Sequence, residues 1–278
     1  MPESPEVHAF AEFVAERAVG RVVAAFAVHD FAAYKTRAIS PGVLTGAEVR
    51  SVRRHGKYVD LVVGARHLVL SFGRHGWGVW HDEDVAASGE QDAASGPPVV
   101  ARIEFAGAGP LDLTEAGPFR SAAFWIVADP TDVPAIAGLG PDPADPGFAQ
   151  SDVDAATVGR RKQLKAVLQE QSSFAGIGNA YSDEILFAAR LPPTIHAATL
   201  AADERVRLFE AMTDEVRTAI ADRRGVPIAQ LKAAKVAAMR VHGRGGEPCP
   251  VCGGEIADFA FGGTTAQWCP VCQAPSVP

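Results

Sequence analysis

The spacing of apolar residues changes along the chain, from one helix to a series of strands and then to further helices. Val7, Phe10 and Val14 share one helical face and Gly20 follows as a stop, which predicts an amphipathic helix over residues 5–18. After it come short runs of β-branched, aliphatic and aromatic residues bounded by turn residues, which predict strands. The predicted strands cover residues 21–28, 58–63, 68–72, 99–105 and 122–127.

Turn and linker residues divide this pattern into parts. Residues 64–67 read as a hairpin connection, and several short strands favour an antiparallel sandwich or barrel. Residues 128–149 are dense in Pro, Gly and Asp, which is typical of a linker. Beyond it, helices are predicted over residues 161–171, 180–189, 201–223 and 228–240. The chain therefore reads as an α+β multidomain protein, with a β domain over 1–128, a helical domain over 129–240 and a small ribbon over 241–278.

Composition is that of a globular protein. The chain has 278 residues, of which 47% are hydrophobic and 21% charged, and this excludes a disordered acidic tail, a collagen-like repeat and a coiled coil. No apolar run approaches the ~18 residues of a membrane helix, and the first residues resemble no secretory signal. We expect a cytoplasmic protein without a membrane partner.

The net charge of −7 by itself argues against a nucleic-acid partner, but the charges are distributed unevenly along the chain. Residues 1–75 hold ten Lys or Arg against seven Asp or Glu, whereas residues 76–150 hold two against twelve. Residues 223–244 hold six basic residues and no acid. A basic face can therefore exist on this acidic chain, although such runs are most often solvated surface.

The four cysteines form two CxxC pairs. Cys249 and Cys252 are followed, after sixteen residues, by Cys269 and Cys272. Two such knuckles close a tetrahedron of thiolates, so the spacing predicts one structural Zn²⁺ in a C-terminal ribbon. Two disulfides or four buried thiols are the alternatives, and the lack of an export signal disfavours disulfides.

The N-terminus offers a candidate nucleophile. Removal of Met1 would leave Pro2 with a free secondary amine, which titrates near ~8 and is partly neutral at working pH. A neutral amine can attack an electrophilic carbon and form an iminium, with Glu3 and Glu6 as general acid or base. Taken alone, Pro and Glu at a helix start are ordinary capping and dipole chemistry.

Four stretches in order resemble the formamidopyrimidine-DNA glycosylase and endonuclease VIII family. Residues 1–7, MPESPEV, resemble the family's MPELPEV opening, and RRHGKY at 53–58 resembles its RRxGKY segment. Residues 165–187, KAVLQEQSSFAGIGNAYSDEILF, resemble its helix-two-turn-helix signature, and residues 241–249 begin what resembles its zinc finger. The resemblance implies an N-terminal β-sandwich with a leading helix, a helix-two-turn-helix domain and a C-terminal zinc ribbon.

The resemblance also implies roles for individual residues. Pro2 would be the nucleophile at the sugar C1′, Glu3 would protonate the opening sugar ring and Glu6 would support it. Lys57 stands where the family places a lysine near the scissile phosphate; without the family, a solvated lysine at a strand start is the plainer interpretation.

The helical signature suggests further contacts to DNA. Gly178 and Asn179 precede or begin a helix whose N-terminus is a natural phosphate site, and an ordinary Gly-rich turn with an Asn cap is compatible with that role. Lys165 matches a family lysine and is expected to contact phosphate.

Several positions depart from the family pattern. The finger arginine that clamps phosphates is replaced by Thr264, for which Arg244 or Arg240 could substitute. The loop residues that fill the space of the flipped base are replaced: Arg74 occupies the Met position and His75 follows, Gly117 or Pro118 occupies the Arg position, and Phe119 is retained. The segment from about 218 to 240 is short and helical, so the long lesion-capping loop of the oxidised-purine enzymes is expected to be reduced, which favours a wider preference than 8-oxoguanine.

The sequence hypothesis is a base-excision repair glycosylase with abasic-site lyase activity, acting as a monomer on duplex DNA that contains damaged bases or abasic sites. The acidic stretch Asp82–Asp92 should then face away from DNA. One alternative is a DNA-binding family member that has lost base excision, and a more distant one is a zinc-ribbon protein that binds RNA or a protein.

Overall fold

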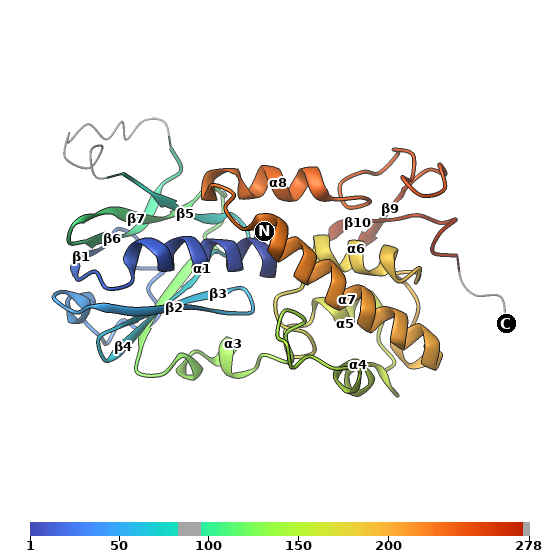
Figure 1. Ribbon diagram of the computed structural model, residues 1–278, viewed down its shortest axis with the longest axis horizontal. Helices are drawn as coiled ribbons and strands as arrows, with labels where there is room; N and C mark the ends of the chain where they lie inside the picture. The colour runs from blue at the N-terminus through green and yellow to red at the C-terminus, as the bar shows by residue number, and fades with distance from the viewer. Residues whose placement is uncertain (83–95, 275–278) are drawn as a thin grey trace. The chain divides into compact units, whose positions relative to one another are not determined.

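The computed structural model describes residues 1–82 and 96–274, which group into two compact units (Figure 1). The first unit contains Met1–Pro2, Glu6–Ala137 and Gly225–Gln230, and the second contains Glu3–Pro5, Gly138–Arg224 and the described chain from Leu231 onward. All of the acidic stretch after Asp82 lies outside the described residues. The three domain boundaries drawn from the sequence are a separate division of the chain and stay a prediction.

Among the described residues, the first unit contains helix α1 (Ser4–Ala18) from Glu6 onward and two four-stranded antiparallel sheets, so the predicted sandwich with a leading helix is confirmed. One sheet has the order β1-β6-β7-β5 and the other β2-β3-β4-β8. The first sheet's strands are β1 (Val23–Val28), β6 (Val99–Phe105), β7 (Ala108–Glu115) and β5 (Gly76–Trp80). The second sheet's strands are β2 (Val49–His55), β3 (Tyr58–Val63), β4 (Arg66–Ser71) and β8 (Ala123–Val127).

The apolar face of α1 packs against the strands. Val7, Phe10 and Val14 are fully buried, and the Phe10 ring lies 4.9 Å from that of Phe72, just after β4, in an edge-to-face arrangement. A Cβ at Gly78 in β5 would lie 2.3 Å from the Phe10 ring, so only glycine allows this close approach. The helix predicted from the 3.6-residue period is thereby confirmed, together with its buried side.

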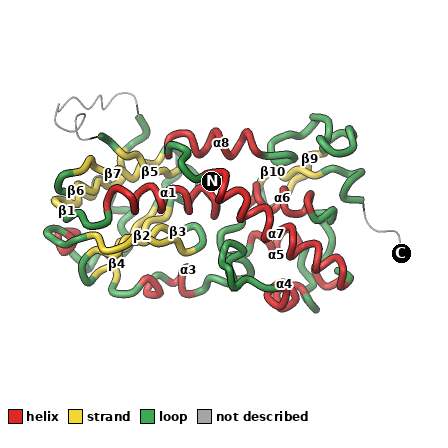
Figure 2. The backbone as a smooth tube through the Cα atoms, in the orientation of Figure 1, coloured by secondary structure: helices red, strands yellow, loops and turns green. Residues whose placement is uncertain are grey.

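The second unit is mainly helical, with one antiparallel hairpin (Figure 2). Buried side chains of four helices share one core, among them Leu164, Leu186, Leu208 and Met212. The helices are α4 (Gln150–Thr157), α5 (Leu164–Gln169), α6 (Asn179–Ala188), α7 (Ala202–Arg223) and α8 (Leu231–Ala238). The hairpin consists of β9 (Ala257–Phe261) and β10 (Thr264–Trp268).

Some elements differ from the sequence prediction. Strands β2, β5 and β7 were not predicted, because charged and glycine residues interrupt their apolar pattern. The predicted linker contains a 3-10 turn and the short helix α3 (Pro134–Ala137). The helix predicted over 228–240 is a 3-10 turn, Ile228–Gln230, followed by α8. Across the described residues, we find no helix with the length and apolar character needed to cross a membrane.

Candidate functional site

The carboxylate of Glu3 lies at the N-terminus of helix α6. It accepts hydrogen bonds from the backbone N–H groups of Gly178 at 2.5 Å, Ala180 at 3.1 Å and Tyr181 at 3.3 Å. Glu3 is 2% exposed. Free N–H groups and the helix dipole make such a terminus an anion site, and here the anion is a side chain of the chain itself. The N–H of Gly178 is therefore engaged by Glu3. The phosphate contact expected at this helix N-terminus stays a prediction.

Glycines make this contact sterically feasible. A Cβ on Gly178 would lie 2.6 Å from the carboxyl carbon of Glu3, and Gly176 has a φ of +86° that L side chains rarely adopt. The N–H of Ser4 also donates to the Gly176 carbonyl at 3.0 Å. The residues after Pro2 are thus fixed against the Gly-Ile-Gly turn, which explains why that turn needs its glycines.

Lys235 of α8 is a second charged group at Glu3, a contact that its sequence pattern does not predict. Its ammonium donates to Glu3 Oε1 at 2.9 Å, and its side chain is 11% exposed. The same ammonium lies 5.0 Å from the centroid of the Tyr181 ring, within the range of a cation–π interaction. The basic run over residues 223–244 was the available signal, although it did not distinguish Lys235 from its neighbours.

Lys165 has a different position from the one expected. Its side chain is fully buried, and its ammonium donates to Asp183 at 2.5 Å, to the Ser182 hydroxyl at 2.7 Å and to the Asn179 carbonyl at 3.1 Å. Burial lowers its pKa, against the opposing effect of Asp183 and the more distant Glu3. A direct phosphate contact by Lys165 does not fit this position, because the ammonium lies in the interior and holds the first turn of α6.

The side-chain amide of Asn179 is also engaged within the second unit. Asn179 Nδ2 donates to the carbonyl of Thr265 in β10 at 2.9 Å, and Asn179 Oδ1 accepts from Gln169 at 3.2 Å. The start of α6 is in this way connected to the hairpin of the ribbon.

Two acidic residues of α6 hold the segment that leads into the ribbon. Glu184 accepts the backbone N–H groups of Arg240, Val241 and His242 at 2.9–3.1 Å. The neighbouring Asp183 has its Oδ2 2.7 Å from the Nδ1 of His242. This explains why Glu184 and Asp183 are almost fully buried charges, since each is surrounded by donors.

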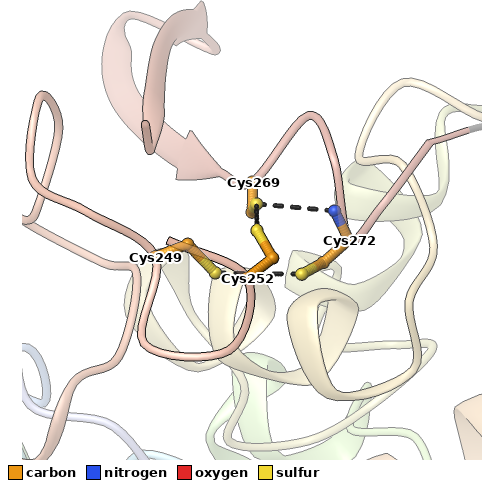
Figure 3. Close-up of side chains that lie close together, drawn as sticks. All are labelled: Cys249, Cys252, Cys269 and Cys272. Atoms are coloured by element: carbon orange, nitrogen blue, oxygen red, sulfur yellow. Dashed lines mark hydrogen bonds between the residues drawn. The ribbon is translucent and has the colours of Figure 1, made fainter. Parts of the chain in front are cut away.

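The four cysteines lie together and face one another (Figure 3). Their sulfur atoms all lie within 4.8 Å of one another, and Cys252 and Cys269 are separated by 3.5 Å and Cys249 and Cys272 by 3.8 Å. Tetrahedral zinc with bonds of about 2.3 Å places its sulfurs about 3.8 Å apart, so the geometry fits one structural Zn²⁺. Burial would raise the pKa of Cys249, yet the N–H groups of Cys252 and Val251 lower it to about 7. Burial and the neighbouring thiols raise the pKa of Cys272 to about 12.

Thr264, where the family has an arginine, lies in the exposed turn of the hairpin. Its hydroxyl donates to the carbonyl of Phe261 at 2.8 Å and thus closes the turn. The two possible substitutes are also engaged. Arg240 pairs with Glu184 and with Glu215 at 2.6 Å, and Arg244 donates to the Met239 carbonyl at 2.9 Å.

The loops expected to fill the space of a flipped base lie side by side in the first unit. The backbone N–H groups of Arg74 and His75 donate to the Ser121 hydroxyl at 2.9 and 3.3 Å. Ser121 in turn donates to Glu115, whose carboxylate also accepts the N–H of Ala122. The Phe119 side chain is 80% exposed. The side chains of Arg74, His75 and Phe119 thus extend from loops whose backbones share one hydrogen-bond network.

The remaining candidates of the first unit are placed by local structure. Gly56 and Lys57 form the two-residue turn between β2 and β3, where His55 pairs with Tyr58. Arg54 donates to the Gly56 carbonyl at 2.9 Å and so braces the turn that carries Lys57. Glu6 lies buried in the first turn of α1, and Pro2 precedes that helix.

Three family models match consecutive parts of the chain. They describe the formamidopyrimidine-DNA glycosylase N-terminal domain over residues 1–116, the H2TH domain of formamidopyrimidine-DNA glycosylase over 139–229, and a zinc finger found in FPG and IleRS over 246–275. The formamidopyrimidine-DNA glycosylase of Geobacter sulfurreducens is 30% identical over 98% of this chain and all of its own length. The chain belongs to the formamidopyrimidine-DNA glycosylase family.

Other relatives agree with this membership. An uncharacterised formamidopyrimidine-DNA glycosylase-like protein of Mycobacterium tuberculosis is 39% identical over 135 residues, which are 49% of this chain and 84% of that protein. The solved structure of Lactococcus lactis Fpg (MutM) in complex with FAPY-dG-containing DNA matches with a TM-score of 0.85 and 23% identity, over 98% of this chain and 100% of that one. The family's zinc-finger model together with the sulfur geometry makes the cysteine cluster a structural zinc site.

Proposed function

We propose that this chain is a DNA glycosylase and abasic-site lyase that removes damaged bases from duplex DNA through the amine of Pro2. The observation that carries the proposal is the position of Glu3. Its buried carboxylate accepts hydrogen bonds from the N-terminus of α6, and Glu3 directly follows the candidate nucleophile Pro2 in the sequence. Relatives across nearly the whole chain are named as glycosylases, and solved relatives hold DNA with damaged bases or abasic sites.

The proposed chemistry proceeds by covalent catalysis. Once Met1 is removed, the lone pair of Pro2 attacks C1′ as the glycosidic bond breaks and the base leaves with its electron pair. Pro2 then gives up its amine proton to water, and the sugar ring opens to an iminium as O4′ takes a proton, for which Glu3 is the proposed donor and Glu6 the supporting acid. Loss of a C2′ proton then expels the 3′ phosphate, near which Lys57 is proposed to lie, and hydrolysis releases Pro2.

The DNA contacts follow from the same proposal. Enzymes that act on a base flip it out of the duplex, and side chains must occupy the space it leaves. We assign this role to Arg74, His75 and Phe119, whose loops are braced by Ser121 and Glu115. The proposed contacts to the sugar-phosphate backbone of the DNA come from Asn179, Arg244 and Thr264. The protein is proposed to act as a cytoplasmic monomer that binds chromosomal DNA.

A second candidate function is damage recognition without base excision. It is favoured by Thr264, an uncharged residue whose hydroxyl is already engaged by Phe261, in place of a charged phosphate contact. Such a binder would recognise abasic or damaged duplex DNA and make no covalent intermediate.

Borohydride trapping on a duplex with one abasic site tests the proposal. We expect a covalent protein–DNA product with the Met1-processed protein, much less product with Pro2→Gly, whose N-terminal amine is primary, and no product with an N-terminal tag, while duplex binding is retained. Glu3→Gln should slow excision of a formamidopyrimidine far more than trapping at a preformed abasic site, whose sugar opens unaided. Duplex binding without any trapped product would contradict the enzyme and leave the binder.

A further inference from the structure

The hydrogen bonds around Glu3 leave little room for a proton on its carboxyl group. An ionised carboxylate offers about four lone-pair sites, and four donors are directed at Glu3. Its Oε2 accepts from Gly178 and Tyr181, and its Oε1 accepts from Ala180 and Lys235. Donors of this kind stabilise the ionised form, whereas the proposed reaction needs Glu3 to deliver a proton to O4′.

The four donors differ in how they can move. The N–H groups of Gly178, Ala180 and Tyr181 belong to the first turn of α6, a helix whose first turn is itself held by buried Lys165. They cannot leave Glu3 unless that turn unwinds. Lys235 reaches Glu3 with a flexible side chain from α8, where Leu231 is the buried residue and the neighbouring Val236 is 63% exposed. Lys235 is therefore the donor that can leave Glu3 by a change of side-chain rotamer, without unwinding a helix.

We propose that Lys235 is a positioning residue that controls the protonation of Glu3, holding it ionised in the free protein and releasing Oε1 when DNA binds. The inference rests on the proposed function of Glu3 as proton donor. The phosphates of bound DNA supply the competing anion, because an ammonium that leaves one carboxylate needs another negative partner. Release of Lys235 then leaves Oε1 able to take a proton.

The other charges facing Glu3 do not offer this control. Lys165 from α5 acts on Glu3 through space but is fixed by its short contact to Asp183. The α6 terminus contributes a constant positive dipole, and the Pro2 amine is one residue away in the chain. Of these groups, Lys235 alone combines a full charge with a direct side-chain contact to Oε1.

Titration of the Glu3 carboxyl group in the full-length, zinc-loaded protein tests the first half of the proposal. The ¹³C carboxyl signal, assigned by its loss in Glu3→Gln, is followed with pH. In Lys235→Met the midpoint should rise by about one pH unit or more, because the ionised form loses a charged hydrogen bond. Lys235→Arg should stay near the parent. The matched control is Lys232→Met, an exposed lysine of the same helix, which should move the midpoint by no more than a few tenths of a unit.

The second half is tested by adding a duplex that carries a tetrahydrofuran abasic-site analogue, which cannot be cleaved. In the parent protein the Glu3 midpoint should rise on DNA binding, and in Lys235→Met it should change much less. An equal midpoint in parent and Lys235→Met, or a parent midpoint that DNA leaves in place, would overturn the proposal. Should Lys235→Met fail to fold, the parent titration with and without the duplex still decides it.

Trapping separates this inference from the proposed function. Abasic-site trapping depends on Pro2 and not on proton delivery by Glu3, so all Lys235 variants should form the covalent product if Pro2 is the nucleophile. Absence of trapping in the parent protein would end the proposed function, whereas the titration result reports on Lys235 alone.

Discussion

At the scale of single residues, this chain places charged groups in its interior and surrounds them with donors and acceptors. Lys165, Asp183 and Glu184 are almost fully excluded from water, and each has several hydrogen-bond partners. Removing one partner of such a group is costly, because the other charge then remains buried and unpaired. These residues organise the start of α6 and the chain that enters the ribbon, and their side chains do not face solvent.

Glu170 provides a residue-scale prediction about pH. Hydrogen bonds from the Ser173 hydroxyl and Lys162, together with the charge of Arg160, lower its pKa to about 2. Because the folded-state pKa lies below the unfolded value of about 4.3, Glu170 stabilises the fold above that value, and the contribution is lost as pH falls from about 4.5 toward 2. We expect Glu170→Gln to lower the free energy of unfolding by about 1 kcal/mol at pH 7.

The measurement is urea unfolding of both proteins at pH 7 and at pH 3. The difference between Glu170→Gln and the parent should shrink at the lower pH, because Glu170 is then protonated in the unfolded chain while it stays mostly ionised in the folded protein. A difference that is the same at both values would show that Glu170 acts through something other than its ionised carboxylate.

At the scale of elements, the N-terminus of α6 contacts both Glu3 and the hairpin of the zinc ribbon, all within the second unit. It binds Glu3 through its backbone N–H groups and the ribbon through the contact of Asn179 with Thr265. Helix α6 carries Asp183 and Glu184 one turn later, and these hold His242 and the segment before it. One ten-residue helix therefore positions both the proposed proton donor and the zinc ribbon.

A change at Gly178 tests this arrangement. In Gly178→Ala the new Cβ would lie 2.6 Å from the Glu3 carboxyl carbon, so Glu3 has to leave the helix terminus. We expect formamidopyrimidine excision to fall more than tenfold, since proton delivery requires Glu3 in place, with a smaller loss of duplex binding. Gly42→Ala is the control, because its Cβ would meet one atom at an ordinary 3.5 Å. Excision equal in the two variants would contradict the assigned role of the terminus.

At the scale of the whole molecule, the chain forms two compact units, and the zinc ribbon belongs to the second one. Hydrogen bonds, in addition to the covalent chain, attach the ribbon to the helices. Gln273 Nε2 donates to the Leu191 carbonyl at 2.9 Å, and the N–H of Gln267 lies 3.3 Å from Asp183 Oδ2. Metal binding, ribbon folding and the position of α6 should therefore be coupled.

Removal of zinc tests this coupling. Bound zinc should stabilise the fold by about 4 kcal/mol when free zinc exceeds its Kd a thousandfold. A chelator that removes the zinc should therefore destabilise the protein. Hydrogen exchange should accelerate in β9, β10 and the first turn of α6, and remain unchanged in the sheets of the first unit. Restored zinc should reverse the change, and Cys252→Ser should reproduce it. Faster exchange confined to the ribbon would show that α6 is independent of the metal.

The sequence by itself determined the local elements with strong periodicity and the groups whose chemistry depends on spacing along the chain. The apolar face of α1, strands β3 and β6, helix α7 and the paired cysteines could all be predicted because each is encoded within a few neighbouring residues. The Met-Pro-Glu opening and the Gly-Ile-Gly-Asn turn were found in the same way, as short motifs.

Only the tertiary structure decided which distant groups meet. The contact of Glu3 with α6 spans more than 170 residues of sequence and that of Glu3 with Lys235 spans 232, and no local pattern encodes either. For the same reason Lys165 was expected at a phosphate and lies in the interior, since its charge is visible in the sequence whereas Asp183 as its partner is not. Strands β2 and β5 were missed because arginines and glycines interrupt their apolar pattern, and pairing with β3 and β7 in the folded sheets is what makes these segments strands.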